Sequence, residues 1–121
     1  MKEQILWKDR PRTLGLPLSF TRYRLSRDRI FRQEGIFGYR EEEIELYRVQ
    51  DLQLQAGLFQ RLFGVGTIVV LSTDRTTPRM VIRNVARPRQ VKELIHRCAE
   101  EAKQRHFQAL GRVGVPRQEI P

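Results

Sequence analysis

The chain has 121 residues, of which 40% are apolar, and this composition predicts one domain with a small compact core. One cysteine excludes an internal disulfide, and the sequence shows neither a secretory leader nor an apolar run near the ~20 residues of a membrane-spanning helix, so we expect a cytoplasmic domain. The formal net charge of +9 lies mainly at the two ends, since residues 1–40 hold ten Lys or Arg against four Asp or Glu and residues 87–121 hold eight against four.

Short strands joined by turns are predicted for the first half of the chain. A turn is expected at residues 26–28, because Ser26 and Asp28 can bond their own backbone. The next turn is expected at residues 35–38, whose glycines can adopt positive φ. The predicted strands are residues 4–7, 16–25, 29–33, 39–47 and 49–56.

The strand at residues 39–47 has a clear period of two. Ile44 and Leu46 alternate with glutamates, which predicts one buried and one solvated face. In the strand that follows, Val49 falls on the face that is otherwise polar. We therefore expect a bulge or a break near Arg48.

A single tight turn or a short helix is predicted at residues 57–63, whose apolar side chains have helical spacing. Gly64 would end this helix with positive φ, and Gly66 would permit a bulge or a close approach to another segment. A phosphate-binding glycine loop is disfavoured, because such a loop follows a strand and opens a helix, whereas here the helix comes first. Strands are expected at residues 67–72, as the central strand of a sheet, and at residues 79–85.

The C-terminal part changes to helical periodicity. Apolar residues recur every three or four positions from residue 87, which predicts an amphipathic helix over about residues 87–110. Pro88 suits its first turn, and Gly111 is expected to end it. Cys98 lies on the apolar stripe and is predicted to be a buried thiol. Residues 1–111 would form the domain and residues 112–121 a flexible tail.

The predicted fold class is mainly β, with about seven antiparallel strands in a split barrel or two-sheet sandwich capped by one C-terminal helix. The segments LYRVQDL at residues 46–52 and QAGLFQRLFGVGT at residues 55–67 resemble the signature of bacterial pleckstrin-homology-like domains. The segments at residues 23–29 and 33–35 also match that pattern. The resemblance covers about residues 16–105 and implies a PH-like fold of two nearly orthogonal sheets closed by a helix. The motif positions, which we expect to be structural, are Arg48, Gln50, Asp51, Arg61, Gly64 and Gly66.

No catalytic, cofactor or metal site is predicted. His96 and His106 are ten positions apart and point to different helix faces, so a metal centre is not expected. No serine has the glycine-flanked setting of a hydrolase nucleophile. The glutamates of residues 41–45 are interpreted as a solvated strand face rather than as acid–base pairs. We therefore expect a non-enzyme without a cofactor.

The arginine-rich hairpin is the candidate binding site for an anion or a lipid. Its residues are Arg22, Arg24, Arg27 and Arg29. In lipid-binding relatives with a PH fold, basic residues of the first hairpin hold phosphorylated headgroups, and the arginine fork suits phosphate. The alternative is that these arginines pair with the acidic strand of residues 41–45 or are simply solvated.

Two hypotheses for function follow. The first is a non-catalytic module that binds a protein partner or a second copy of itself through a sheet edge. The second is peripheral binding to anionic lipid at the inner face of the membrane. Nucleic-acid binding has less support, because aromatic residues do not alternate with the basic cluster. Phe37 at a turn is a candidate membrane or partner anchor, whereas Phe59 and Phe63 are predicted to pack in the core.

Overall fold

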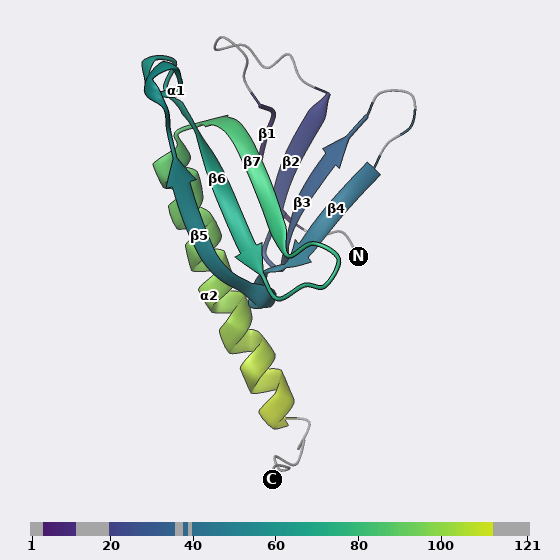
Figure 1. Cartoon of the computed structure of the whole chain (residues 1–121). Coiled ribbons are helices and arrows are strands. Elements are labelled where there is room, and N and C mark those ends of the chain that lie inside the picture. The colour runs from purple at the N-terminus through teal and green to yellow at the C-terminus, as the bar shows by residue number, and fades with distance from the viewer. Residues whose placement is uncertain (1–3, 12–19, 36–37, 39, 113–121) are drawn as a thin grey trace.

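The computed structural model describes residues 4–11, 20–35, 38 and 40–112 (Figure 1). The elements in chain order are β1 (Ile5–Asp9), β2 (Thr21–Ser26), β3 (Arg29–Glu34), β4 (Arg40–Glu45), the 3-10 turn η1 (Leu46–Arg48), β5 (Val49–Gln55), α1 (Leu58–Leu62), β6 (Val65–Ser72), β7 (Arg79–Ala86) and α2 (Pro88–Arg112). These boundaries confirm the predicted order of strands and helices within the described residues. Residues 12–19, 36–37 and 113–121, which include the start of one predicted strand, Phe37 and most of the predicted tail, lie outside them.

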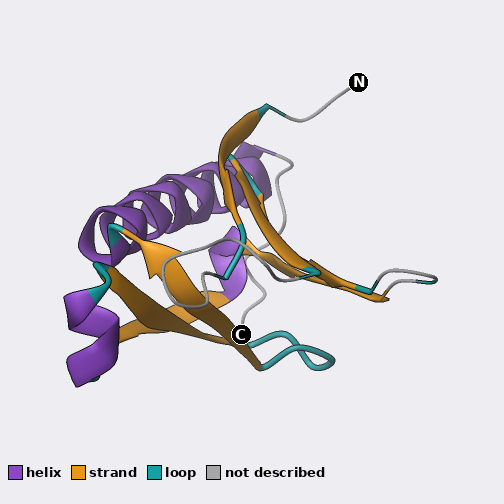
Figure 2. Cartoon of the chain, turned by 90° about the horizontal axis from the view of Figure 1, so that it is seen from above, coloured by secondary structure: helices purple, strands orange, loops and turns teal. Residues whose placement is uncertain are grey.

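The strands form two antiparallel sheets. One sheet has the order β1-β2-β3-β4, and the other has the order β5-β6-β7, with β6 in the centre as predicted. The two sheets meet at an angle, and α2 lies across one open side between them (Figure 2). This helix contacts η1, β5 and β6. The described architecture therefore confirms the mainly-β sandwich with a C-terminal helical cap.

The core lies between the inner faces of the two sheets and the apolar stripe of α2. Tyr23 and Ile44 come from the first sheet, Ile68 and Ile82 from the second, and Ile95 from the helix, and all five are at most 1% exposed. The Tyr23 hydroxyl accepts a hydrogen bond from the Arg83 backbone N–H at 2.9 Å, so it also links the two sheets. Trp7 packs against this core with its ring stacked on that of Tyr23.

The chain passes from one sheet to the other at η1, where the sequence predicted a break. Leu46 N–H donates to the Asp28 carbonyl at 2.8 Å, which fixes the crossing point. The pairing register between β5 and β6 then shifts between Val49 and Asp51. This shift lets Val49 turn inward, and the residue is buried despite its position on the polar face of the sequence pattern.

The two central glycines have the structural roles that were predicted. Gly64 has a φ of 71° and ends α1. Gly66 lies against the start of α2, where a Cβ atom would be 2.8 Å from Cγ and 2.9 Å from Cβ of Pro88. The register between β6 and β7 also shifts beside Gly66.

The prediction that Gly111 ends the long helix is wrong, since α2 continues through it to Arg112. Gly111 does not have positive φ, so it does not form the left-handed cap that often ends a helix. None of the helices in the described part of the chain is both long enough and apolar enough to cross a bilayer.

Candidate functional site

The β2–β3 turn is held by a buried serine. Ser26 Oγ accepts hydrogen bonds from the backbone N–H of Arg29 at 3.1 Å and of Asp28 at 3.4 Å. Arg105 of α2 donates to Asp28 Oδ1 at 2.8 Å and to the Arg27 carbonyl at 3.2 Å. This end of the hairpin is therefore tied to the helix.

The glutamates of β4 lie beside the arginine-rich hairpin, as the pairing alternative expected. Arg24 forms an ion pair with Glu41 at 2.9 Å, and Arg29 forms one with Glu43 at 3.3 Å. The Arg24 guanidinium also lies over the Phe31 ring, 4.6 Å from its centroid. These contacts orient Arg24 and Arg29 on the outer face of the sheet, although partly exposed pairs of this kind contribute little stability.

Two of the four predicted arginines share a concave surface. A hollow of about 580 Å³ is lined by Lys8, Asp9, Arg10, Arg22, Tyr23, Arg24, Phe31 and Gln33, and we call it the β1–β2 hollow. Arg27 and Arg29 do not line it, because they lie near the opposite end of the hairpin. The four residues predicted for the site did not include Lys8 and Arg10, although Arg10 comes just before the arginine-rich hairpin in the sequence. Lys8 is directly opposite Arg24 in the β1–β2 register, so strand pairing was the signal that would have found it.

The described residues around the β1–β2 hollow carry excess positive charge. Asp9 is the only acidic residue among them. Its Oδ1 accepts from the Arg10 backbone N–H at 2.8 Å, and its Oδ2 accepts from the Ala86 N–H at 3.4 Å. Of the four basic side chains of the hollow, Arg24 is also paired with Glu41, which does not line the hollow. The only described carboxylate that lines the hollow, that of Asp9, already has backbone donors.

A second surface is formed by α1, and here the prediction of core packing is wrong. Phe59 is 75% exposed and Phe63 is 43% exposed. Leu58 at 79% and Leu62 at 75% share this exposure, and we call the four side chains the α1 tip. The helix has five residues and projects beyond the ends of β5 and β6, so no other described element covers its apolar side (Figure 1).

Gln60 fastens the opposite side of α1 to the second sheet. Its Nε2 donates to Thr67 Oγ1 at 2.9 Å and to Asn84 Oδ1 at 2.7 Å. Its Oε1 accepts from the Gly57 backbone N–H at 2.9 Å. Asn84 has a positive φ of 52°, which is uncommon outside glycine and marks a specialised position in β7. The side of α1 that faces the domain is therefore polar and hydrogen-bonded.

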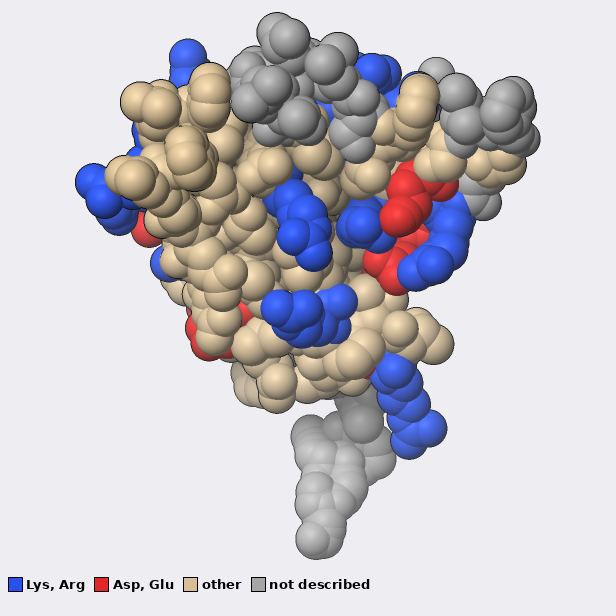
Figure 3. All heavy atoms as spheres, turned by 45° about the horizontal axis from the view of Figure 1, so that its top comes forward, with Lys and Arg blue, Asp and Glu red and all other residues tan. Residues whose placement is uncertain are grey.

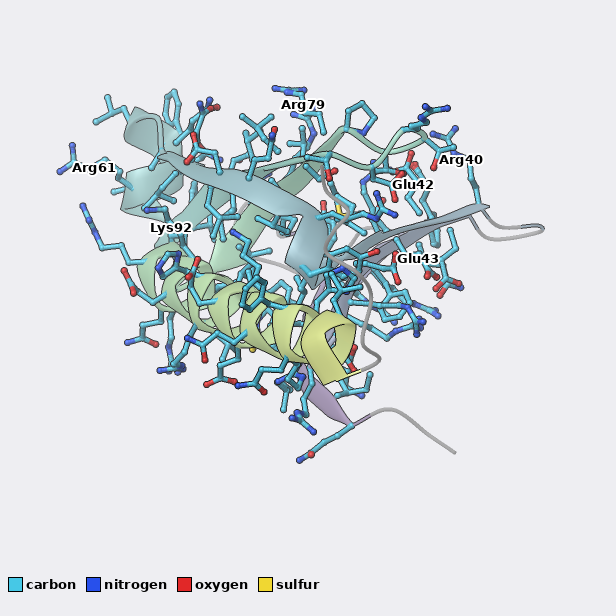
Figure 4. The ribbon with its side chains drawn as sticks, turned by 90° about the horizontal axis from the view of Figure 1, so that it is seen from below. Arg40, Glu42, Glu43, Arg61, Arg79 and Lys92 are labelled. Atoms are coloured by element: carbon cyan, nitrogen blue, oxygen red, sulfur yellow. The ribbon has the colours of Figure 1, made fainter. Side chains whose placement is uncertain are left out.

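Basic residues surround the base of the α1 tip. A hollow of about 970 Å³ lies between α1 and the start of α2, and the ionisable side chains described around it are Arg61, Arg87, Arg89 and Lys92. We call these four residues the basic rim. Arg61 and Lys92 lie at the same end of the molecule in Figure 4. Figure 3 shows a largely uncharged region over α1 at its upper left, bordered by Lys and Arg side chains.

The β1–β2 hollow and the α1 tip lie toward the same end of the sandwich. The hydrogen bond between Asp9 and Ala86 joins the end of β1 to the end of β7. Ala86 is paired in turn with Val65 at the start of β6, next to α1. Both surfaces are therefore near the upper end of the molecule in Figure 1.

The remaining motif residues lie in η1 and at the start of β5. Arg48 Nε donates to Glu45 at 3.3 Å, and this hydrogen bond is the main reason that the pKa of Arg48 is raised. The Arg48 carbonyl accepts from the Thr73 N–H at 2.9 Å. Gln50 and Asp51 are exposed on β5.

The other candidate side chains lie on α2. Cys98 is buried as predicted, and burial raises the pKa of its thiol. His106 stacks on Tyr47 with ring centroids 3.8 Å apart, whereas His96 is exposed. Among the described residues, the structure shows no cluster of three or more side chains suited to a metal ion.

Residues 14–99 of the chain match a protein-family model described as "Bacterial PH domain". The chain belongs to the bacterial PH domain family. This match confirms the PH resemblance of the sequence. Members of this family are in general non-catalytic binding modules. A search of the curated proteins found no match to this bacterial PH domain.

Proposed function

We propose that this bacterial PH domain is a peripheral module that binds anionic membrane lipid, with the β1–β2 hollow as the headgroup site. The observation that carries the proposal is the convergence of Lys8, Arg10, Arg22 and Arg24 on one hollow in which Asp9 is the only acidic residue described. An anionic leaflet attracts such a cluster, by about 1 kcal/mol for each basic residue near the surface. The cytoplasmic face of a membrane carries lipid of this charge.

The side chains of the hollow suit a phosphate group in different ways. Arg22 is exposed and presents its donor fork to solvent, and a fork of this kind binds two phosphate oxygens in parallel. Arg24 is oriented by Glu41 and the Phe31 ring, so binding would cost it less side-chain entropy. Lys8 adds a compact point charge. Free phosphate and a lipid phosphate share this chemistry, and the test separates them.

The test is cosedimentation with neutral and anionic vesicles at low and high salt. The Lys8→Gln/Arg22→Gln variant is expected to bind anionic vesicles at least about tenfold more weakly, because two charges are lost at the surface. The matched control is Arg75→Gln/Arg79→Gln, which removes the same charge from the β6–β7 loop and the start of β7, whereas the hollow adjoins the other end of β7 through the bond between Asp9 and Ala86. Inorganic phosphate as competitor distinguishes a site for free anions from a membrane site.

Three results bear on this proposal. Weak binding of the hollow variant together with normal binding of the control supports it. Equal losses in both variants would indicate attraction by net charge without a site. Absence of binding to anionic vesicles at low salt would refute the lipid function.

A protein partner, including a second copy of the chain, is the second candidate. The far end of α2 extends beyond the sheets (Figure 1), and Phe107 and Leu110 are exposed there at 77% and 45%. Residues three apart on a helix share one face, so these two form a small apolar surface. If the partner is a second copy, light scattering should show a dimer that becomes monomeric in Phe107→Ser/Leu110→Ser. A monomer at every concentration would exclude self-association.

A further inference from the structure

We propose that α1 is a membrane-insertion element, separate from the headgroup site. In this arrangement the α1 tip (Leu58, Phe59, Leu62 and Phe63) enters the boundary between headgroups and acyl chains. The basic rim (Arg61, Arg87, Arg89 and Lys92) stays among the anionic headgroups. The inference rests on the proposed function for its ligand class, but it assigns a surface and a mode of contact that the β1–β2 hollow does not provide.

The exposure of the α1 tip requires an explanation. Single apolar residues on a protein surface are common, but four large ones gathered on one short element are typical of an interaction site. The core of the domain is complete without them, since the buried cluster is built from other residues of both sheets and of α2. Folding of the domain therefore leaves the α1 tip exposed to solvent. An apolar environment outside the domain would bury it.

The hydrogen bonds of Gln60 explain why the tip stays exposed. Turning the apolar side of α1 inward would break the bonds of Gln60 to Thr67 and Asn84 and the bond from Gly57. Partly buried polar groups that lose their partners are costly, so these bonds hold the helix in its present orientation. The α1 tip is consequently presented in a fixed direction, and its insertion requires no rearrangement of the domain.

The charge around the α1 tip favours a membrane as the partner of this surface. In a bilayer the apolar layer is covered by a layer of anionic headgroups. The α1 tip is apolar and has the basic rim behind it, so an inserted tip would reach the apolar layer while the rim would meet the headgroups. If two copies of the chain docked tip to tip, the basic rim of one copy would face the basic rim of the other. The like charges of the two rims would repel each other. The shared end of the molecule also allows one flat membrane to contact both the tip and the β1–β2 hollow (Figure 1).

Depth-dependent quenching tests the insertion directly. The chain has one tryptophan, so the background is Trp7→Phe, which keeps a ring against Tyr23. Phe59→Trp in that background is expected to be quenched by vesicles with brominated acyl chains and to shift its emission to the blue. Phe107→Trp is the matched control, because it has similar exposure but lies at the opposite end of α2, and it is expected to show neither change.

A second measurement uses Leu58→Ser/Leu62→Ser, whose thermal unfolding should match that of the unsubstituted chain. Its affinity for anionic vesicles is expected to fall about tenfold, and the binding that remains should be abolished by high salt, since only the electrostatic part is left. The Lys8→Gln/Arg22→Gln variant, once bound at high lipid concentration, should retain quenching at position 59. This retention would separate insertion from headgroup binding.

The outcomes distinguish the two proposals. Vesicle binding without quenching at position 59, or with equal quenching at positions 59 and 107, would overturn the insertion while the lipid function stands. Absence of binding to anionic vesicles would overturn both. A change of oligomeric mass in Leu58→Ser/Leu62→Ser, without vesicle binding by the unsubstituted chain, would assign the tip to a protein contact instead.

Discussion

Ile95→Ala is expected to lower the free energy of unfolding by about 2–5 kcal/mol. Ile95 is fully buried in the cluster where α2 packs against the two sheets. Truncation removes apolar contacts and leaves a cavity that a closely packed core fills only in part. Urea unfolding followed by circular dichroism would measure the change, with the slope in denaturant expected to stay the same.

The matched control is Leu62→Ala, a truncation of similar size on α1. Leu62 is 75% exposed, so the free energy of unfolding should change by no more than about 0.5 kcal/mol. A large loss at Leu62 would mean that the α1 tip packs against the domain in solution. The proposed insertion element would then be part of the core.

Gly66→Ala is expected to destabilise the domain by about 1–3 kcal/mol, because it overfills a contact between two elements. The new Cβ would lie 2.8 Å from the Pro88 ring, and a proline ring at the first position of a helix cannot rotate away. The start of α2 or the backbone of β6 must therefore move. Denaturant titration again gives the size of the effect.

Gly111→Ala provides the comparison for this substitution. Gly111 lies within the last turn of α2, and apart from the neighbouring backbone of the helix itself an added Cβ would meet no atom within 4 Å. Alanine has a higher helix propensity than glycine, so the free energy of unfolding should stay the same or rise by less than about 1 kcal/mol. Equal destabilisation at both positions would show that the loss at Gly66 does not come from the contact with Pro88.

The apolar periodicity predicted both helices, but it could not tell which of them is covered. In α2 the stripe that includes Ile95 and Cys98 is buried, as expected. In α1 the same type of spacing led to the prediction that Phe59 and Phe63 belong to the core, which the structure contradicts. Periodicity shows which side chains share a face of an element. Whether another element lies over that face depends on contacts between distant parts of the chain, which a local pattern does not contain.

The order of the strands along the chain and the crossing between the sheets could be predicted from local sequence patterns. The parity change at Val49 indicated the break, and the structure places η1 and a register shift at this point. The charge pattern was less informative. The sequence offered pairing of these arginines with the acidic strand of residues 41–45 as one alternative, but it could not show which arginines pair with which glutamates. Nor could it show that Lys8 joins the hollow through strand pairing.

The length and direction of α2 have a consequence for any assembly on a membrane. The helix starts beside the α1 tip at Pro88 and runs for 25 residues, or ~37 Å at a rise of 1.5 Å per residue, to the opposite end of the domain. With α1 in the headgroup layer, the helix becomes a rigid spacer, and Phe107 and Leu110 are held well away from the lipid. One end of this small domain would then set its position on the membrane. The other end would determine the height at which a protein partner is held above it.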